Sequence, residues 1–391
     1  MSKKIYLDNA ATTKVRKEVV EEMIKYFDEF YGNPSSQLYE LGRKSKEAIE
    51  KSRKTIADFI NADEKEFYFT GGGSESDNWE IKGVAFANMK KGKHIITTKI
   101  EHHAILHTCE YLEKFGFETT YLDVDQYGMI DLEQLKVSIR PDTILISIMY
   151  ANNEIGTIQP IEQIGEIAHE HGIIFHTDAV QAMGAVKIDV KKQHIDLMSM
   201  SAHKVGGPKG IGGMYIRKGV KIDNFIHGGG QERGKRAGTE GVQNIVGFGK
   251  AVELINKNFD KHVEALTLKR NKLIEGIKSN IEDVILNGHP TMRLPNNVNF
   301  SYKYVEGESI LLLLDMEGIA ASSGSACTSG SLDPSHVLLA TGLDHGTAHG
   351  SIRFTLSEEI TDEDIEFVVE TMKSIIEKLR KISPLNKNNA M

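Results

Sequence analysis

The chain is organised around one stretch, Ile195-Asp-Leu-Met-Ser-Met-Ser-Ala-His-Lys-Val-Gly-Gly-Pro-Lys-Gly210, in which an apolar run leads to a lysine and a glycine-rich loop follows. The run from Ile195 to Met200 has the composition of a buried strand. Burial disfavours the charged form of a lysine, and the neutral amine is a nucleophile that attacks aldehydes. A lysine taken alone is more often a solvated surface residue. The role of Lys204 therefore depends on the residues that accompany it.

Short apolar runs alternate with longer helical patterns on both sides of this stretch. This alternation is typical of βαβ units with a mostly parallel sheet. The predicted strands are Phe67–Thr70, His94–Thr97, Thr143–Met149, Ile173–Phe175, Ile195–Met200 and Gly213–Ile216. The predicted helices are Val15–Phe30, Leu38–Ile60, Ser74–Met89, Ala104–Phe115 and Ile161–His171. We therefore predict an α/β fold with a large domain over residues 14–255.

A smaller domain is predicted beyond the glycine-rich segment His227–Gly241. One long polar helix over about residues 244–279 is expected to lead out of the large domain. The predicted elements after it are strands at 297–300, 319–321 and 351–355 and helices at 307–316 and 365–379. The last helix has apolar residues at 3.6 spacing on one face. We assign residues 1–13 and 256–391 to this α+β domain.

The composition narrows the classes of partner. The 391 residues carry a formal net charge of −8, which argues against nucleic acid or an anionic membrane as the main partner. Cys109 and Cys327 are the two cysteines, and neither has a zinc-ligand spacing, so we expect neither a disulfide framework nor a cysteine-rich metal site. The longest apolar run, Ile310–Leu314, is too short to span a bilayer. No apolar signal segment follows the N-terminal methionine, and we expect a cytoplasmic protein.

A glycine-rich turn between a predicted strand and a predicted helix suits a phosphate group. The turn is Thr70-Gly-Gly-Gly-Ser-Glu-Ser-Asp77. Backbone N–H groups around Gly73, the positive end of the helix dipole and the Ser74 hydroxyl can all bind a phosphate. A glycine-rich turn that is merely capped by a serine is an equally good reading of this motif alone.

The motif His176-Thr-Asp-Ala-Val-Gln181 follows another predicted strand. Ligands bind at the carboxyl ends of strands in open α/β sheets, so Asp178 and Gln181 are expected to face a crevice there. An aspartate in that position can keep a pyridine nitrogen protonated, which makes the ring an electron sink, and Gln181 can donate to a phenolic oxygen. Asp178 could also cap a following helix.

Two further loops are expected at the same crevice. In Glu101-His-His-Ala104, the imidazole of His102 can stack on an aromatic cofactor and move protons near neutral pH. A metal site is disfavoured there because no carboxylate or cysteine at ligand spacing completes it. In Tyr150-Ala-Asn-Asn-Glu-Ile-Gly156, Asn152 and Asn153 offer uncharged donors, although such a pair is also common turn chemistry.

Taken together, seven motifs resemble the cysteine desulfurases, a group within the class V aminotransferase superfamily. They occur in order over nearly the whole chain. The motifs are Tyr6-Leu-Asp-Asn-Ala-Ala-Thr-Thr13, Gly32-Asn-Pro-Ser-Ser36, Asn152-Asn-Glu-Ile-Gly156, His176-Thr-Asp-Ala-Val-Gln181, Ser201-Ala-His-Lys204, His227-Gly-Gly-Gly-Gln-Glu-Arg-Gly234 and Ser322-Ser-Gly-Ser-Ala-Cys-Thr-Ser-Gly330.

The resemblance implies a pyridoxal 5'-phosphate enzyme of fold type I that converts L-cysteine to L-alanine. It assigns covalent attachment of the cofactor to Lys204, pairing with the pyridine nitrogen to Asp178, contact with the ring hydroxyl oxygen to Gln181, and ring stacking to His102. The implied phosphate ligands are Gly73, Ser74, Ser201 and His203, together with Thr239 from a neighbouring subunit, and a homodimer follows from the last of these.

The resemblance also implies how substrate is bound. Arg353 matches the arginine that grips the substrate carboxylate, a role that suits its bidentate guanidinium. An ion pair at a sheet edge is the second interpretation of this arginine. Asn153 matches the residue near the ring oxygen and the bound substrate.

The two cysteines have different sequence surroundings. Cys109 lies within a predicted helix and is expected to be a buried small hydrophobe. Cys327 lies in residues 322–331, which contain no large apolar side chain, and we expect a mobile loop that exposes a reactive thiol. This loop resembles the longer kind found in the family. We therefore expect Cys327 to take sulfur from the substrate as a persulfide and to pass it to an acceptor protein, such as an iron–sulfur scaffold.

Two alternatives stay open at this point. An aminotransferase or a selenocysteine lyase would keep the cofactor and change the reaction. A sulfur-carrier or scaffold-binding protein without catalysis would not need the set formed by Lys204, Asp178, Gln181 and His102.

Overall fold

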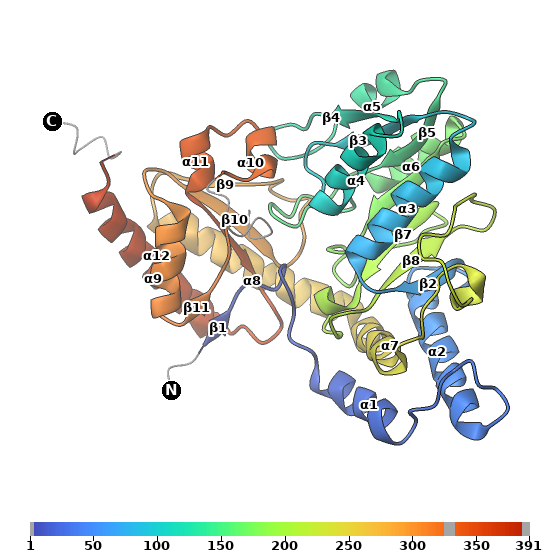
Figure 1. The fold of residues 1–391 in the computed structure, drawn as a ribbon. Coiled ribbons are helices and arrows are strands. Elements are labelled where there is room, and N and C mark those ends of the chain that lie inside the picture. Colours follow the sequence, from blue (N-terminus) through green and yellow to red (C-terminus); the bar gives the residue numbers. More distant parts are fainter. Residues whose placement is uncertain (1–3, 324–332, 385–391) are drawn as a thin grey trace.

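The computed structural model describes residues 4–323 and 333–384, and its largest element is a sheet of seven strands (Figure 1). The strands are β2 (Phe67–Thr70), β3 (His94–Thr98), β4 (Glu118–Leu122), β5 (Thr143–Ser147), β6 (Ile174–Asp178), β7 (Leu197–Ser201) and β8 (Gly212–Ile216). Their order is β2-β8-β7-β6-β5-β3-β4. β8 runs antiparallel to β2 and β7, whereas the other neighbours are parallel. The predicted α/β fold with a mostly parallel mixed sheet is confirmed.

Helices cover both faces of this sheet (Figure 1). The helices of this part are α1 (Lys17–Asp28), α2 (Glu40–Phe59), α3 (Gly73–Asn88), α4 (His103–Glu113), α5 (Leu132–Ser138), α6 (Ile161–Glu170) and α7 (Val242–Lys257). The apolar side chains of α3 and α4 pack on one face, and those of α2, α6 and α7 pack on the other.

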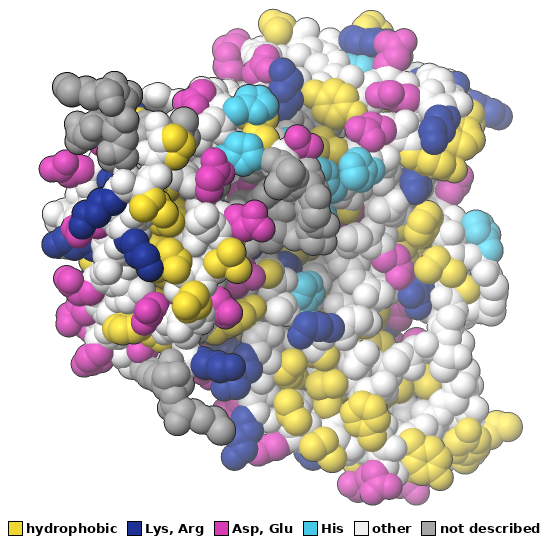
Figure 2. Space-filling view, turned by 60° about the vertical axis from the view of Figure 1, so that its left-hand side comes forward, with side chains coloured by type: hydrophobic (Ala, Val, Ile, Leu, Met, Phe, Trp, Pro, Cys, Tyr) yellow, Lys and Arg dark blue, Asp and Glu magenta, His cyan; other side chains and the backbone are white. Residues whose placement is uncertain are grey.

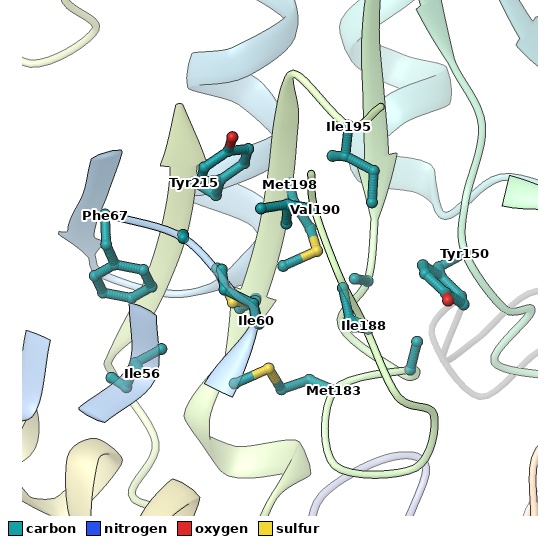
Figure 3. Close-up of a cluster of buried hydrophobic side chains, with 14 of the residues drawn as sticks. Ile56, Ile60, Phe67, Tyr150, Met183, Ile188, Val190, Ile195, Met198 and Tyr215 are labelled. Carbon is teal, nitrogen blue, oxygen red and sulfur yellow. The ribbon is translucent and has the colours of Figure 1, made fainter. Parts of the chain in front are cut away.

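Successive residues of each strand point to opposite faces, which divides the apolar side chains into two cores. In β3, Ile95 joins the core under α3, whereas Ile96 joins the core under α2. Figure 3 shows part of the core under α2, where Ile56 of α2, Phe67 of β2 and Met198 of β7 belong to one cluster. Burial on both faces explains why these strands are apolar runs without polar alternation.

A second sheet lies beside the first part and has its own core. β10 (Asn297–Tyr302) pairs antiparallel with β9 (Val284–Leu286) and β12 (Ser351–Thr355). The helices around it are α8 (Phe259–Asn280), α9 (Gly307–Met316), α10 (His336–Ala340), α11 (His345–His349) and α12 (Asp362–Ile382). Apolar side chains of α8, α9 and α12 form one cluster with those of β10 and β12. The division into a large domain over residues 14–255 and a smaller one stays a prediction. It is supported by the separate cores of the large sheet and of the second sheet.

The predicted single helix over residues 244–279 is wrong. The chain forms α7 and α8, which meet at Asn258, where φ is −137° and the backbone is not helical. Apolar side chains of α7 pack in the core under α2 on the large sheet, whereas those of α8 pack in the core of the second sheet. One straight helix could not face both cores. The sequence analysis also did not predict β4 or β9, two short edge strands, of which β4 mixes polar and apolar residues and β9 has three residues.

The N-terminal segment belongs to both parts. β1 (Ile5–Tyr6) pairs parallel with β11 (Ile319–Ala320), and Ile5 and Leu7 are buried in the core of the second sheet. The chain then crosses to the large sheet, where Thr13 N donates to the carbonyl oxygen of His203 at 2.9 Å. This crossing places residues 8–13 at the carboxyl ends of the large-sheet strands.

The surface has no extended region of one charge sign on the face shown in Figure 2, where acidic, basic and histidine side chains are interspersed. Among the helices of residues 4–323 and 333–384, none combines the length and the apolar composition that crossing a membrane requires.

A buried ion pair ties α2 to the glycine-rich segment after β8. Arg53 and Glu232 are both almost fully buried, and their closest side-chain atoms are 2.7 Å apart. Glu232 also accepts from the backbone N–H of Phe69 at 2.9 Å. Removing Glu232 would leave the buried Arg53 with only the half-exposed Glu50, 3.0 Å from its Nε, as a counter-charge.

Replacing Glu232 by Gln should lower the free energy of unfolding by about 3 kcal/mol, because the Arg53 guanidinium loses its buried counter-charge and keeps only the half-exposed Glu50. Urea unfolding measures the change. Asp58→Asn is the control, since the Lys54–Asp58 pair on the same helix is exposed and should contribute little. Equal losses in the two variants would contradict this account of the buried pair.

Candidate active site

A cavity of about 310 Å³ opens at the carboxyl ends of β6 and β7, facing β12 of the second part. Seven separate segments of the chain line it. Ten of the predicted site residues contribute to the lining: Gly73, Ser74, His102, Asn153, Asp178, Gln181, Ser201, His203, Lys204 and Arg353. The structure therefore brings these residues together, while their individual roles stay predictions.

Lys204 is presented by a single 3-10 turn, Ala202–Lys204, that directly follows β7. Gly206, two residues after this turn, has a φ of +78°, which favours glycine, and its backbone N–H donates to Thr13 Oγ1 at 2.8 Å. The amine of Lys204 donates to the carbonyl oxygens of Ala10 and Ala11, at 2.9 Å in the second case. The N-terminal segment thus holds the lysine at the cavity wall, a contact that strand patterns did not predict.

Asp178 is the last residue of β6 and faces the cavity. One carboxylate oxygen accepts from Val180 N at 2.9 Å. The alternative that Asp178 caps a helix is wrong, because residues 180–185 form turns. Gln181 in these turns donates to the carbonyl oxygen of Ala10 at 3.0 Å. Both side chains are therefore fixed by backbone groups next to the lysine.

The start of α3 forms the other end of the cavity. Gly72, its N-cap residue, has φ +156° and provides no side-chain cap for the first-turn N–H groups. A Cβ on Gly73 would lie 2.8 Å from Val180 Cγ2, so only glycine lets the helix start this close to the cavity wall. Ser74, Ser201 and His203 surround a neighbouring hollow that continues from the cavity. This end offers hydroxyl, imidazole and backbone donors to an anion.

His102 is the N-cap residue of α4, and its Nδ1 accepts from Ala104 N at 3.1 Å. The proton of the neutral ring is therefore on Nε2. Burial lowers the pKa of His102, an effect that the Asp178 carboxylate opposes and the Lys204 ammonium supports. A neutral imidazole at the cavity wall can stack on an aromatic ring and donate from Nε2.

Arg353 lies on β12 and is almost fully buried. It donates to the carbonyl oxygen of Asn153 at 3.0 Å and forms an ion pair with Asp8 at 2.9 Å, and its buried Nε has no hydrogen-bond partner among residues 4–323 and 333–384. Arg353 therefore has both of the features expected from the sequence: the ion pair exists, and the guanidinium also faces the cavity.

Asn152 does not face the cavity, because its side-chain amide is buried and bonded to Ile100 O and Glu154 N. It holds the loop and is not a cofactor ligand.

Two predicted site residues, Thr239 and Cys327, are not among the lining residues named above. Thr239 is exposed and does not line it. Cys327 lies outside the described residues. Cys109 is fully buried in α4, and burial raises the pKa of its thiol to about 12. The thiol therefore stays neutral, which agrees with the predicted role of a small hydrophobic residue.

Sequence reasoning missed two groups at the site. Asp77 lines the cavity one helical turn after Ser74, a position that the i, i+3 spacing could have indicated. The carbonyl groups of Ala10 and Ala11 gave no such signal, since backbone atoms carry no residue-specific pattern.

The residues around the cavity fit pyridoxal 5'-phosphate. A lysine amine suits its aldehyde, the Asp178 carboxylate its pyridine nitrogen, the His102 imidazole its ring, and the uncapped start of α3 its phosphate. Gly73 leaves room at the phosphate end that a side chain would fill. The fold and this donor set define a pyridoxal-phosphate enzyme of fold type I.

Comparison with known proteins defines the family. Residues 5–368 match the family model described as aminotransferase class-V. A cysteine desulfurase IscS of Methanosarcina thermophila is 60% identical over 384 residues, which cover 98% of this chain and 95% of the relative. A cysteine desulfurase IscS of Clostridium botulinum is 57% identical, with 98% and 97% covered. The chain belongs to the class-V aminotransferase family, in the group of the cysteine desulfurases, which are pyridoxal-phosphate dependent.

Solved structures agree with this assignment. A NifS-like protein superposes with a TM-score of 0.90 at 38% identity, covering 96% of this chain and all of that one. The structure described as SspA in complex with cysteine superposes with a TM-score of 0.81 at 40% identity, covering 90% and 99%.

Stability should fall as the pH is lowered from about 6.5 towards 4. Burial, together with the charges of Lys204 and Lys209, lowers the pKa of His203 from an ordinary value of 6.5 to about 4. Between these values the unfolded chain binds a proton that the folded chain does not, so acid favours unfolding. Chemical unfolding of His203→Asn should show a smaller loss over this pH range. The exposed His345→Asn is the control, and an identical pH dependence in wild type and His203→Asn would refute the effect.

Proposed function

We propose that this protein is a cysteine desulfurase that converts L-cysteine to L-alanine and transfers the sulfur to Cys327. The observation that carries the proposal is the single cavity that combines Lys204, Asp178 and His102 with a buried arginine. Relatives that are 57–60% identical over nearly the whole chain bear this name. A related structure is described in complex with cysteine.

The chain supplies the binding and proton-transfer groups. When bound, pyridoxal phosphate supplies an aldehyde that condenses with amines and a protonated ring that accepts electrons. Asp178 would hold the proton on the ring nitrogen, and the start of α3 with Ser74, Ser201 and His203 would hold the phosphate. Lys204 would remove the α-proton of the substrate and later return it.

Arg353 would orient the substrate. Its Nε makes no hydrogen bond to any of the described residues, and its Nη atoms are fixed by Asn153 and Asp8. A guanidinium held in this way can bind the substrate carboxylate without first ordering its own side chain. His102 is the group best placed to move protons on the opposite side of the cavity.

Cys327 would complete the reaction. Its thiolate attacks the sulfur of the substrate, a new S–S bond forms, and the C–S bond breaks with its electron pair retained by the carbon that becomes the methyl group of alanine after protonation. The products are alanine and a persulfide on Cys327. An acceptor protein, such as an iron–sulfur scaffold, would then take the sulfur.

The experiment that tests the function measures alanine and persulfide formed from cysteine. Lys204→Ala should lower alanine formation at least about a thousandfold, because it removes both the cofactor attachment and the base. Cys327→Ser should keep the cofactor absorption band and lose the persulfide. Normal alanine and sulfide production by Cys327→Ser would contradict the proposal. A requirement for a keto acid would indicate an aminotransferase, and a preference for selenocysteine would indicate a lyase.

We also propose that the active unit is a homodimer in which Thr239 completes the phosphate site of the partner. Thr239 is exposed, and Arg236 in the same segment pairs with Glu75 of α3 at 2.9 Å, which keeps the segment near the phosphate end. Sedimentation should give twice the chain mass of 43.5 kDa, and Thr239→Val should weaken cofactor retention. A fully active monomer would contradict the dimer. A cytoplasmic location stays a prediction.

A further inference from the structure

A buried layer of polar side chains lies between α3 and the large sheet, next to the cavity. α3 contributes Asp77 and Glu80, and β6 contributes His176, which shares the sheet face of Asp178 because the two are two residues apart. Glu80 and His176 have no exposed surface, and Asp77 is 2% exposed. Ionisable groups in such a place cost stability unless they are paired, and apolar side chains would pack there at no such cost.

His176 is the centre of this layer. Its Nε2 lies 2.9 Å from Glu80 Oε2 and 3.0 Å from Ser199 Oγ, and its Nδ1 lies 2.8 Å from Ser147 Oγ. The Ser199 hydroxyl donates to the same Glu80 oxygen. Because the Glu80 carboxylate accepts from Nε2, that nitrogen carries a proton, and the imidazole is held from both sides.

The layer reaches the cavity at two carboxyl groups. Asp77 lines the cavity, and its Oδ1 lies 3.9 Å from His176 Nε2 with no hydrogen-bond partner. Asp178 lines the cavity from the end of β6 and pairs in register with Ser199 of β7. Glu80 itself does not line the cavity, so it can act on a ligand there only through these neighbours.

Within the described part of the chain, the titratable groups that act on Asp77 and Glu80 are Glu101, His176 and Asp178. Burial raises the pKa of Asp77, and the charge of Asp178 raises it further. Burial also raises the pKa of Glu80, which His176 opposes, and raises the pKa of Glu101 to about 8. A protonated Asp77 would not compete with Asp178 for a cation in the cavity.

We propose that Glu80 and His176 are positioning residues for the cofactor: their hydrogen bond fixes the end of β6 from which Asp178 meets the protonated pyridine nitrogen. This inference rests on the proposed function, because it takes pyridoxal phosphate as the ligand. Two other roles are possible for the same side chains. They could serve only to lock α3 onto the sheet, or Asp77, Glu80 and His176 could hold a metal ion, since their ligand atoms lie within 4.8 Å of one another.

The test compares Glu80→Gln with Glu80→Met in the holoenzyme. Gln keeps an oxygen that accepts from His176 Nε2, whereas Met keeps the size and removes the acceptor. The dissociation constant for pyridoxal phosphate, followed by the absorption of the bound cofactor, should rise about tenfold in Glu80→Met and stay within about threefold of wild type in Glu80→Gln. Ser199→Ala is the milder second variant, for use if Glu80→Met does not fold, and it should raise the constant by about threefold.

Glu232→Met is the matched control, because it removes a buried, ion-paired carboxylate that does not line the cavity. It should lower stability and leave the dissociation constant unchanged. Glu80→Met with lower stability and wild-type cofactor binding would overturn the inference in favour of a purely structural role, and so would equal losses in the Gln and Met variants. One equivalent of metal in the purified holoenzyme that Glu80→Met lacks would also overturn it. Wild-type protein that binds pyridoxal phosphate and forms no alanine from cysteine would overturn the proposed function alone.

Discussion

The site depends on the crossing of the N-terminal segment from one core to the other. Ile5 and Leu7 are anchored in the core of the second sheet, while the carbonyl groups of Ala10 and Ala11 accept from the amine of Lys204 at the end of β7. Ala10 also accepts from Gln181. These backbone acceptors fix the lysine and the glutamine relative to each other. The same crossing brings Asp8 to Arg353, so Lys204 and Arg353, which come from the two parts of the molecule, are placed against one segment.

Interior charge is the second constraint. Arg353, Asp178, Glu80 and His176 are all buried, and each has at least one specific partner in the protein. Burying these groups costs folding free energy compared with an apolar core of the same volume, and it fixes the geometry of the side chains around the cavity. The apolar cores on both faces of the large sheet provide the stability that allows this concentration of polar groups at one edge. Fold and site are therefore linked through the strands that carry both.

Much of this organisation could be predicted from the residues. The strands β2, β3, β5, β6, β7 and β8 are apolar because both faces are buried, and the functional side chains follow their ends directly. The break at Asn258 could not be predicted, because the helical patterns before and after it run together and only the positions of the two cores require the bend. The backbone acceptors at Ala10 and Ala11 and the pairing of Glu80 with His176 were equally hidden. They join segments about 100 residues apart or more, and neither helical nor strand periodicity reports such contacts.

The central claim is that Lys204 is the residue that bonds the cofactor in the cavity between the two cores. Reduction of the holoenzyme with borohydride, followed by peptide mapping with mass spectrometry, tests it directly. The account predicts a phosphopyridoxyl group on Lys204, in the peptide that continues from Ser201-Ala-His. The same group on a different lysine, with Lys204 unmodified, would contradict it.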